Sequence, residues 1–463
     1  MKLNYFNFKA FKDKILMTND FGCHVFVTKE EFKSILKRDV DLESNLGKEL
    51  LAKKMVYDET DLEYTSKYMY DIRRIKGHVN SATSLHIFVV TTACNQKCIY
   101  CQANNGSNFT PITMSKETAE KAVDVALQSP SRFLNFEFQG GEPLMNFEII
   151  KHIISYAEAN KGNHEITYNI VTNLTLITDE ILDYFLQNKV DISTSLDGPE
   201  FVHNSNRPFQ NGQGTFETVI KALEKIKEKG MKVGAIQTTT RASLPYPKEI
   251  VRTYKKLGFD NIFLRPLTPL GKASKNWEMI GYTPEEFNRF YRSAVEEIIE
   301  INKGGEFFQE QHASILLKKI DGQFVNYMEL RSPCGAGIGQ MAYYPNGDVF
   351  TCDEGRMLYE MGDPAFRLGN VYDSTFTDLI KNGICKTVCA SSILESVPVC
   401  ADCVYQPYCG TCPVVSYAMN SDVLEKTPRG YRCKVYSSIL DFIFERIYEA
   451  DEFCVELFKS WSN

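Results

Sequence analysis

The stretch "LHIFVVTTACNQKCIYC", residues 85–101, joins an apolar run to three closely spaced cysteines. Its first half predicts a buried β-strand, because it is short, apolar and rich in β-branched and aromatic residues. Its second half places Cys94, Cys98 and Cys101 directly after that strand. Three thiols supply one ligand fewer than a tetrahedral metal normally takes. The stretch therefore predicts a strand followed by a metal-binding loop with one open coordination place.

The strand pattern recurs five times further along the chain, with helical patterns in between. The apolar runs cover residues 133–138, 166–172, 191–196, 232–240 and 261–267, and the helical patterns cover 116–128, 146–160, 179–188 and 215–230, the last ending at Gly230. Such alternation predicts right-handed βαβ units and a parallel sheet. Six units fall short of an eightfold barrel, so we expect an α/β fold with a partial (β/α)6 barrel. Its chemistry should lie on the loops at the carboxyl ends of the strands.

Composition narrows the class of protein. A chain of 463 residues is too long to fold around one small hydrophobic core, so we expect two or three domains. With 43% hydrophobic and 24% charged residues and a net charge of -7, the chain resembles an ordinary soluble globular protein, without the charge pattern of nucleic-acid or membrane binding. The sequence shows no signal-like start and no long apolar run, which predicts a cytoplasmic location. In that compartment disulfides are rare, so 14 cysteines indicate metal or redox chemistry.

Two metals fit the first three cysteines. Zinc would need a distant fourth ligand, whereas a 4Fe–4S cluster would use three thiolates and leave one iron open. The C-x3-C-x2-C spacing, with Tyr100 before the third cysteine, resembles the radical S-adenosylmethionine (SAM) superfamily. That resemblance implies that the open iron binds the amino and carboxylate groups of SAM. Reductive cleavage of SAM then yields a 5′-deoxyadenosyl radical, which abstracts hydrogen.

The same resemblance assigns SAM contacts to the ends of later strands. Gly140, Gly141 and Glu142 in "QGGEP" match the motif for the methionine amino group, since glycines let backbone approach and a carboxylate accepts from an ammonium. Asn173 resembles the ribose contact and Ser195 another SAM contact. Arg207 lies where related enzymes hold the SAM carboxylate. Taken singly, a double glycine is usually a turn, and an arginine often forms a surface salt bridge.

Ten of the cysteines lie between Cys334 and Cys454. Their C-x2-C pairs fit a zinc ribbon or knuckle. Behind a radical SAM domain, their order resembles the SPASM domain with its two auxiliary 4Fe–4S clusters. The resemblance implies that one auxiliary cluster is held by Cys334, Cys352 and Cys412, and the other by Cys400, Cys403, Cys409 and Cys433. Compared with the SPASM pattern, this chain has one residue fewer before Cys412 and lacks a cysteine a few residues before Cys334. The first cluster therefore either keeps an open iron or recruits Cys385 or Cys389, of which we favour Cys389.

The chain divides into four segments: an α+β domain at 1–82, the barrel at 83–310, a bridging segment at 311–333 and the SPASM domain at 334–463. In the first segment we expect two short strands around a turn at residues 19–22, a helix starting near Thr28, and then a helix and a closing strand. This winged-helix-like layout loosely resembles the peptide-recognition domains of peptide maturases. It serves either as a structural cap or as a leader-binding domain that adds the peptide as an extra strand.

The whole pattern resembles radical SAM/SPASM peptide maturases, and the runs "STSLDGP", "HNSNRP" and "CVYQPYCG" resemble those of the His-Xaa-Ser system. The resemblance implies a ribosomally made peptide or small protein as partner, a thioether or carbon crosslink as product, and flavodoxin or ferredoxin as electron donor; a second maturase is a further candidate partner. A dehydrogenating maturase of the anaerobic sulfatase-activating type is the first alternative, because Asp353 matches its proposed base. That aspartate fits equally well as a hydrogen-bond partner beside Cys352. A non-catalytic iron–sulfur or zinc protein is the remaining alternative.

Overall fold

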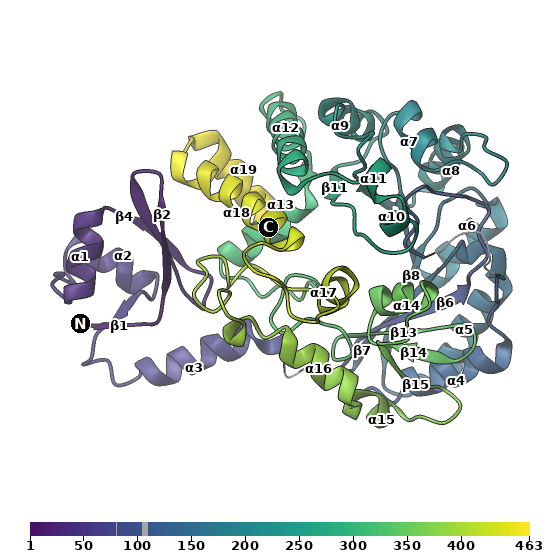
Figure 1. Ribbon diagram of the computed structural model, residues 1–463, viewed down its shortest axis with the longest axis horizontal. Coiled ribbons are helices and arrows are strands. Elements are labelled where there is room, and N and C mark those ends of the chain that lie inside the picture. The colour runs from purple at the N-terminus through teal and green to yellow at the C-terminus, as the bar shows by residue number, and fades with distance from the viewer. Residues whose placement is uncertain (80, 104–109) are drawn as a thin grey trace.

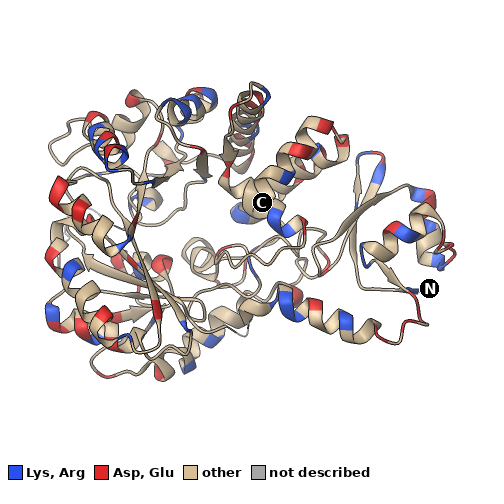
Figure 2. Cartoon of the chain, turned by 180° about the vertical axis from the view of Figure 1, so that it is seen from behind, with Lys and Arg blue, Asp and Glu red and all other residues tan. Residues whose placement is uncertain are grey.

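The computed structural model describes residues 1–79, 81–103 and 110–463. Figure 1 shows the first helices and strands at one end of the long axis and the α/β region at the other, with the C-terminal segments between them. Lys, Arg, Asp and Glu are interspersed over the outer helices, as Figure 2 shows. No helix in the described ranges is long and apolar enough to cross a membrane.

The expected barrel is present. Its six strands are β6 (Leu85–Thr91), β7 (Phe133–Gly140), β8 (Glu165–Val171), β9 (Val190–Ser195), β10 (Val233–Thr238) and β11 (Asn261–Arg265). Each is parallel to its neighbour. Alternation along β7 sends Phe136 and Phe138 into the core, while Glu137 and Gln139 face the concave side. The fold class predicted from the sequence is therefore confirmed.

Helices cover the outer face of these strands. They are α4 (Lys116–Ala126), α5 (Phe147–Asn160), α6 (Asp179–Asn188), α7 (Glu200–Asn206), α8 (Phe216–Glu228), α9 (Pro247–Lys256) and α12 (Pro284–Lys303). The short helices α10 (Lys272–Lys275) and α11 (Trp277–Ile280) lie instead beside the cysteine loop, where Lys272 N–H donates to the Cys101 carbonyl at 2.8 Å. Local chemistry sets their ends. The Ser115 and Thr178 side chains each accept from a backbone N–H at the start of the following helix, and α8 stops just before Gly230. The four helices predicted from periodicity form within a few residues of the expected bounds.

The sheet extends beyond the six predicted strands. Its order is β12-β11-β10-β9-β8-β7-β6-β13-β14-β15. The added strands are β12 (Gln309–Glu310), β13 (Gln340–Tyr343), β14 (Asp348–Phe350) and β15 (Arg367–Asn370). Strand β13 runs parallel to β6, and β14 and β15 follow it antiparallel. The first strands of the cysteine-rich region therefore extend the barrel sheet. This pairing joins residues far apart in the sequence, so the periodicity of the sequence does not predict it.

The first segment has its own small core. A three-stranded sheet, β2 (Asn7–Phe11), β3 (Lys14–Thr18) and β4 (His24–Val27), precedes α1 (Lys29–Lys37) and α2 (Asn45–Ala52), and β1 (Lys2–Leu3) pairs with β5 (Val56–Tyr57). Thr28 caps α1 in a capping box with Glu31, so the helix begins where the sequence predicts. Helix α3 (Tyr64–Ile75), which the sequence analysis did not anticipate, leads towards the barrel.

The C-terminal region is helical apart from its first strands. Its helices are α13 (Gln311–Ile320), α14 (Asp353–Glu360), α15 (Phe376–Lys381), α16 (Gly383–Ser391), α17 (Pro413–Asn420), α18 (Tyr431–Glu449) and α19 (Glu452–Ser462). It binds the first segment closely: Thr18 Oγ1 donates to the Val404 carbonyl at 2.6 Å, and the Tyr408 hydroxyl donates to the Gly22 carbonyl at 2.8 Å. The N-terminal sheet therefore rests on the loop that carries Cys400, Cys403 and Cys409.

Candidate active site

One cavity of about 720 Å³ lies at the carboxyl ends of the barrel strands. It brings together residues from strand ends far apart in the sequence, as the barrel prediction requires. The predicted site residues that line it are Cys94, Cys98, Cys101, Gly140, Gly141, Asn173, Ser195, Arg207 and Asp353. The first eight come from the barrel, and Asp353 comes from the C-terminal region. The cavity is thus enclosed by both parts of the chain.

The cysteine loop is held in place by the segment around Arg207. The backbone N–H groups of Lys97 and Ile99 donate to the carbonyls of Pro208 and Asn206, both at 2.9 Å. Burial raises the pKa of Cys94 to about 12 and that of Cys98 to about 11, and the neighbouring thiols add to both shifts. Three thiols with raised pKa values become thiolates only beside a strong positive partner. A bound iron–sulfur cluster supplies that partner, so the donor set fits such a group.

The glycines of "QGGEP" permit a close backbone approach. A Cβ on Gly140 would lie 2.1 Å from the Thr91 carbonyl oxygen, and one on Gly141 would lie 2.3 Å from that of Ala93. Instead, Gly141 N–H donates to the Thr91 carbonyl at 2.9 Å. In this structure the glycines therefore let the end of β7 pack on the strand that leads into the cysteine loop.

Glu142 lies behind the cavity wall. It is fully buried, and its carboxylate accepts from the backbone N–H groups of Leu144 and Asn173, at 3.1 and 2.7 Å, and from the Thr172 hydroxyl at 2.7 Å. Its carboxylate thus fixes the loop after β8, in a structural role that the sequence analysis did not assign. Its contact with the SAM ammonium stays a prediction.

Asn173 is tied to the cysteine loop from the other side. Its Nδ2 donates to Asn95 Oδ1 at 2.9 Å and lies 3.9 Å from Cys94 Sγ. Its Oδ1 accepts from the backbone N–H and the hydroxyl of Thr175. Ser195 ends β9 at the same edge of the cavity. Asn173 thus stands beside the cysteine loop and Ser195 lines the same cavity, while their contacts with SAM stay predictions.

Arg207 is only 8% exposed and faces the cavity. Its Nη1 donates to the Tyr100 hydroxyl at 2.6 Å, whereas its buried Nε has no hydrogen-bond partner in the part of the chain that the structure describes. The Tyr100 hydroxyl in turn donates to the Asp197 carboxylate, at 2.9 and 3.0 Å to its two oxygens. A buried cation with a free donor fits an anionic ligand such as the SAM carboxylate. Asp197 was overlooked in the sequence, although it stands two residues after Ser195.

The opposite wall comes from α14. Arg356 is 1% exposed, its Nε donates to Asp353 Oδ1 at 2.7 Å and its Nη2 to Gln139 Oε1 at 3.3 Å. Gln139 Nε2 donates to Glu137 Oε1 at 2.6 Å, and burial raises the pKa of that carboxyl. Arg356 Nη1 is buried without a partner. Arg356, which was not identified from the sequence, therefore links Gln139 of barrel strand β7 to Asp353, the predicted base.

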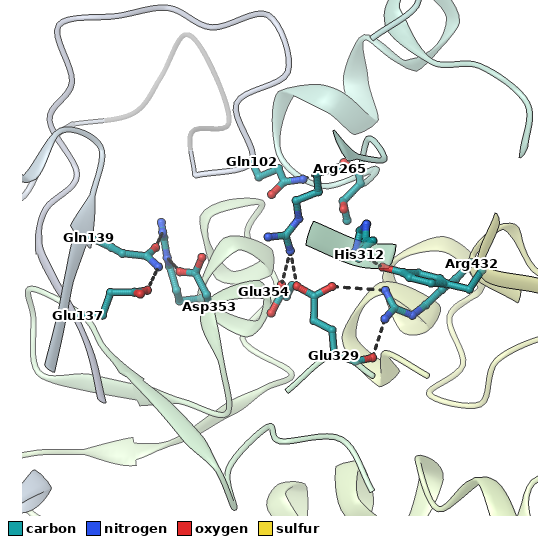
Figure 3. Close-up of polar contacts among 12 residues, drawn as sticks. Gln102, Glu137, Gln139, Arg265, His312, Glu329, Asp353, Glu354 and Arg432 are labelled. Carbon is teal, nitrogen blue, oxygen red and sulfur yellow. Dashed lines mark hydrogen bonds and ion pairs between the residues drawn. The ribbon is translucent and has the colours of Figure 1, made fainter. Parts of the chain in front are cut away.

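A second charged group lies beside this wall. Arg265, at the end of β11, pairs with Glu329 and lies 3.9 Å from Glu354, while Arg432 Nη2 donates to the Glu329 carbonyl at 2.7 Å (Figure 3). Burial raises the pKa of Glu329, but Arg265 and Arg432 outweigh that effect and hold it below its usual range. Arg432 directly precedes Cys433, so this network connects the barrel mouth to the last predicted cluster ligand.

Cys400, Cys403, Cys409 and Cys433 line one small apolar pocket of about 40 Å³. Burial raises the pKa of both Cys400 and Cys433 to about 12. Gln406 and Thr411 line the same pocket with buried polar side-chain atoms that lack partners. Four partly buried thiols beside idle hydrogen-bond donors fit a group whose sulfides accept hydrogen bonds, as an iron–sulfur cluster does.

Cys334, Cys352 and Cys412 share a second apolar cluster with Leu270 and Val414. Burial, Glu354 and the other two thiols together raise the pKa of Cys352. Cys389 does not join them; its thiol interacts with Cys385 on α16, and both pack with the main core. Its part in this site therefore stays a prediction.

Within the residues that the structure describes, no group of three or more His, Cys, Asp and Glu side chains is arranged so that it could hold a metal ion. The fit of these cysteines to iron–sulfur clusters therefore rests on the chemistry of the donors, on the cavity and on the idle polar atoms around them.

Comparison with known proteins agrees with this site. The model of the radical SAM superfamily matches residues 88–247. An uncharacterized protein of Methanocaldococcus jannaschii is 34% identical over 205 residues, which are 44% of this chain and 68% of that protein. A cysteine-type anaerobic sulfatase-maturating enzyme of Clostridium perfringens strain 13 is 26% identical over 379 residues, 79% of this chain and 97% of that enzyme. The chain belongs to the radical SAM superfamily.

Solved structures show the same fold. Native anSMEcpe with bound AdoMet superposes with a TM-score of 0.67 at 22% identity, over 82% of this chain and 100% of that one. SuiB of Streptococcus suis, solved with its precursor peptide SuiA, gives 0.54 at 16% identity, over 93% and 98%. Membership of the superfamily makes this chain an enzyme and implies a 4Fe–4S cluster and SAM. The narrower resemblance to His-Xaa-Ser maturases stays a prediction.

Proposed function

We propose that this enzyme modifies a ribosomally made peptide or small protein by hydrogen abstraction, installing a thioether or carbon crosslink. One observation carries the proposal: a single cavity is lined by the cysteine loop and Arg207 on one side and by Asp353, Glu354 and Arg356 on the other. Its volume of about 720 Å³ lies within the range of ligand pockets and leaves room for a side chain beside a cofactor. When bound, the cluster and SAM supply the 5′-deoxyadenosyl radical.

The ligands are proposed as follows. Cys94, Cys98 and Cys101 hold the SAM cluster, and SAM lies against Gly140, Gly141, Asn173, Ser195 and Arg207 with Glu142 fixing the adjoining loop. Cys400, Cys403, Cys409 and Cys433 hold one auxiliary cluster, and Cys334, Cys352 and Cys412 hold the other, with Cys389 as a candidate fourth ligand. The division at residues 1–82, 83–310, 311–333 and 334–463 is part of the proposal, as is a flavodoxin or ferredoxin donor.

A groove in the first segment supports peptide recognition there. Its volume is about 590 Å³, and its walls include Tyr57 from β5 and Tyr64, Tyr68 and Tyr70 from α3. The Tyr57 and Tyr64 rings stack with centroids 4.2 Å apart. Tyrosines combine apolar area with a hydroxyl, which suits a peptide leader. In the described part of the chain, β2 and β4 each pair on one side only, so the three-stranded sheet has edges that could accept a strand.

A dehydrogenating maturase of the sulfatase-activating type is the second candidate. It is favoured by Asp353, which lines the cavity and is fixed in orientation by Arg356. In that reaction Asp353 takes the proton that leaves the substrate. In the crosslinking reaction the same carboxylate serves to orient Arg356. The two candidates differ in product and not in the cofactor that starts the reaction.

The test is anaerobic co-expression with each short open reading frame beside the gene, followed by mass spectrometry of the peptide. Crosslinking and dehydrogenation each remove two hydrogen atoms from the peptide, one by abstraction and one as a proton and an electron, so each lowers its mass by about two daltons. Fragmentation locates a crosslink by the absence of cleavage inside the ring, and thiol alkylation reports whether a cysteine was consumed. A peptide that keeps its mass with every candidate, while the enzyme still cleaves SAM, would refute the peptide-maturase proposal.

A further inference from the structure

Three buried side chains from distant parts of the sequence form a chain behind the cysteine loop. Asp197 follows β9 and is fully buried; Tyr100 stands between Cys98 and Cys101; Arg207 follows α7. Arg207 Nη1 donates to the Tyr100 hydroxyl at 2.6 Å, and that hydroxyl donates to Asp197 at 2.9 Å. The order of donors is fixed, because a guanidinium has no acceptor and a carboxylate has no donor.

We infer that Asp197 is a positioning residue that acts through the Tyr100 hydroxyl to aim the Arg207 guanidinium at the carboxylate of SAM. The inference rests on the proposed role of Arg207 as the residue that binds this carboxylate. It adds two residues, Asp197 and the phenol of Tyr100, to the machinery that selects and holds the cofactor.

The phenol keeps the two charges apart. A direct ion pair between Asp197 and Arg207 would use the guanidinium donors and leave little positive charge for a ligand. With the hydroxyl between them, Nη1 of Arg207 binds the Tyr100 hydroxyl, while its buried Nε has no partner among the described residues and the side chain lines the cavity. Buried donors without partners are rare, and one that borders a cavity indicates a missing ligand.

Asp197 is itself held firmly. Its Oδ2 accepts from Asn206 Nδ2 at 3.0 Å, and its Oδ1 lies 3.4 Å from the backbone nitrogen of Thr238. Burial raises the pKa of this carboxyl, but Arg207 and the donors around it oppose the shift. A carboxylate fixed at several points is a stable anchor, so the phenol, and with it Arg207, has one preferred position.

The arrangement also joins the cofactor site to the cluster loop. Tyr100 belongs to the loop, and the backbone N–H groups of Lys97 and Ile99 in that loop donate to the carbonyls of Pro208 and Asn206, which flank Arg207. Ordering of the loop therefore places Arg207, and a bound carboxylate in turn fixes the loop. By linkage, loss of the phenol hydroxyl should weaken SAM binding without removing any cluster ligand.

The experiment uses the full chain with reconstituted clusters and compares Tyr100→Phe, Asp197→Asn, the double variant and Arg207→Ala. SAM affinity is measured by equilibrium dialysis, and 5′-deoxyadenosine formation without peptide gives KM and kcat. Tyr254→Phe is the matched control, because Tyr254 is equally buried and its hydroxyl donates to the Leu196 carbonyl at 2.5 Å, outside the chain of three.

We expect Tyr100→Phe to weaken SAM binding roughly ten- to hundredfold, the range for losing a hydrogen bond to a charged group. KM should rise with kcat at saturating SAM retained, and the electron paramagnetic resonance signal of the reduced cluster without SAM should be unchanged. The double variant should be no worse than Tyr100→Phe, because the two residues act in series. Tyr254→Phe should bind SAM like the parent.

Unchanged affinity in Tyr100→Phe, or losses that add in the double variant, would overturn the inference while leaving the proposed role of Arg207 intact. An equal loss in Tyr254→Phe would also overturn it, since the effect would then be general to this core. Unchanged affinity in Arg207→Ala would refute the proposed role of Arg207 as well.

Discussion

Arg356 on α14 reaches Gln139 on barrel strand β7, with Nη2 lying 3.3 Å from Oε1. This contact brings the cysteine-rich region to the mouth of the barrel, and the same guanidinium fixes Asp353 at the cavity wall. The site is thus completed by a part of the chain more than 200 residues away from the strand it meets.

This geometry leads to the first prediction. Arg356→Gln should leave Asp353 and Gln139 without their partner at the cavity wall and cost on the order of 1–3 kcal/mol of unfolding free energy. Peptide modification should fall sharply, whereas 5′-deoxyadenosine formation without peptide should persist, because Arg356 is not a proposed SAM contact. The matched control is Arg367→Gln, which breaks a similar pair with Asp348 at 2.6 Å, outside the residues that line the cavity. If both variants modified peptide equally well, Arg356 would have no role in the site.

The second prediction concerns the cysteine loop. Replacing Cys94, Cys98 and Cys101 together by alanine should abolish 5′-deoxyadenosine and remove about four irons, the content of one cluster. The irons of the C-terminal region should remain, since their cysteines lie in separate pockets and cores. The readouts are chromatography of the nucleoside and iron analysis. A triple variant that still forms 5′-deoxyadenosine would exclude the proposed cluster ligands.

The third prediction separates iron–sulfur clusters from zinc. Anaerobically reconstituted protein should hold roughly twelve irons with matching sulfide, four for each of three clusters. Gln406→Leu, which removes a buried amide without a partner from the pocket of Cys400 and Cys433, should keep the iron and shift only the midpoint potential of one cluster. Stoichiometric zinc with about four irons would instead make the C-terminal region a structural zinc domain.

Much of the architecture was predictable from local pattern. Six apolar runs and four periodic helices were recognised because strand and helix periods are properties of neighbouring residues. The cysteine loop was identified from the spacing of its thiols after the first strand, whereas Arg207 was assigned from the resemblance to radical SAM enzymes, and its contact with SAM stays a prediction. The pairing of β13 with β6 was not predicted, because it joins residues about 255 positions apart and leaves no local trace.

The misses in the site have a similar cause. Asp197 and Arg356 are single polar residues whose burial and partners depend on tertiary contacts, so no period marks them. The support that the Glu142 carboxylate gives to the loop after β8 was also not foreseen, because only the folded backbone reveals it, while the contact of Glu142 with the SAM ammonium stays a prediction. An acidic residue beside a ligand motif was a detectable signal, but its direction was not.

The fourth prediction is a loss of stability in mild acid. His86, His203 and His312 are buried, and burial lowers the pKa of each to about 3 in the folded protein. The unfolded chain protonates them near pH 6.5, so it binds more protons than the folded chain between about pH 6.5 and 3. The stability that these neutral rings contribute is complete above pH 6.5. It is lost as the pH falls, by up to about 1.4 kcal/mol per pH unit for each histidine.

Urea unfolding of the metal-free protein between pH 7.5 and 5 measures this slope. His86→Gln should reduce the slope of the unfolding free energy against pH by about the contribution of one proton. An equal slope in the parent and in His86→Gln would show that the His86 ring is not held neutral in the folded state.

The last prediction concerns the groove of the first segment. Deletion of residues 1–82 is a poor test, because Thr18 and Asn7 bond the backbone of residues 401–404 beside the predicted cluster ligands. Tyr70→Ser is cleaner, since this side chain is 69% exposed and lines the groove. If the leader binds there, binding energy gained far from the reacting atoms delivers the peptide to the cavity. Tyr70→Ser should then raise the KM for full-length peptide several-fold, about 1 kcal/mol for one aromatic contact, and leave 5′-deoxyadenosine formation without peptide unchanged.

Phe133→Ser is the control, being 60% exposed at the start of β7 and outside the groove. A leaderless peptide should show no difference among the three enzymes. Equal KM values for full-length peptide in the parent and Tyr70→Ser would place recognition outside this groove.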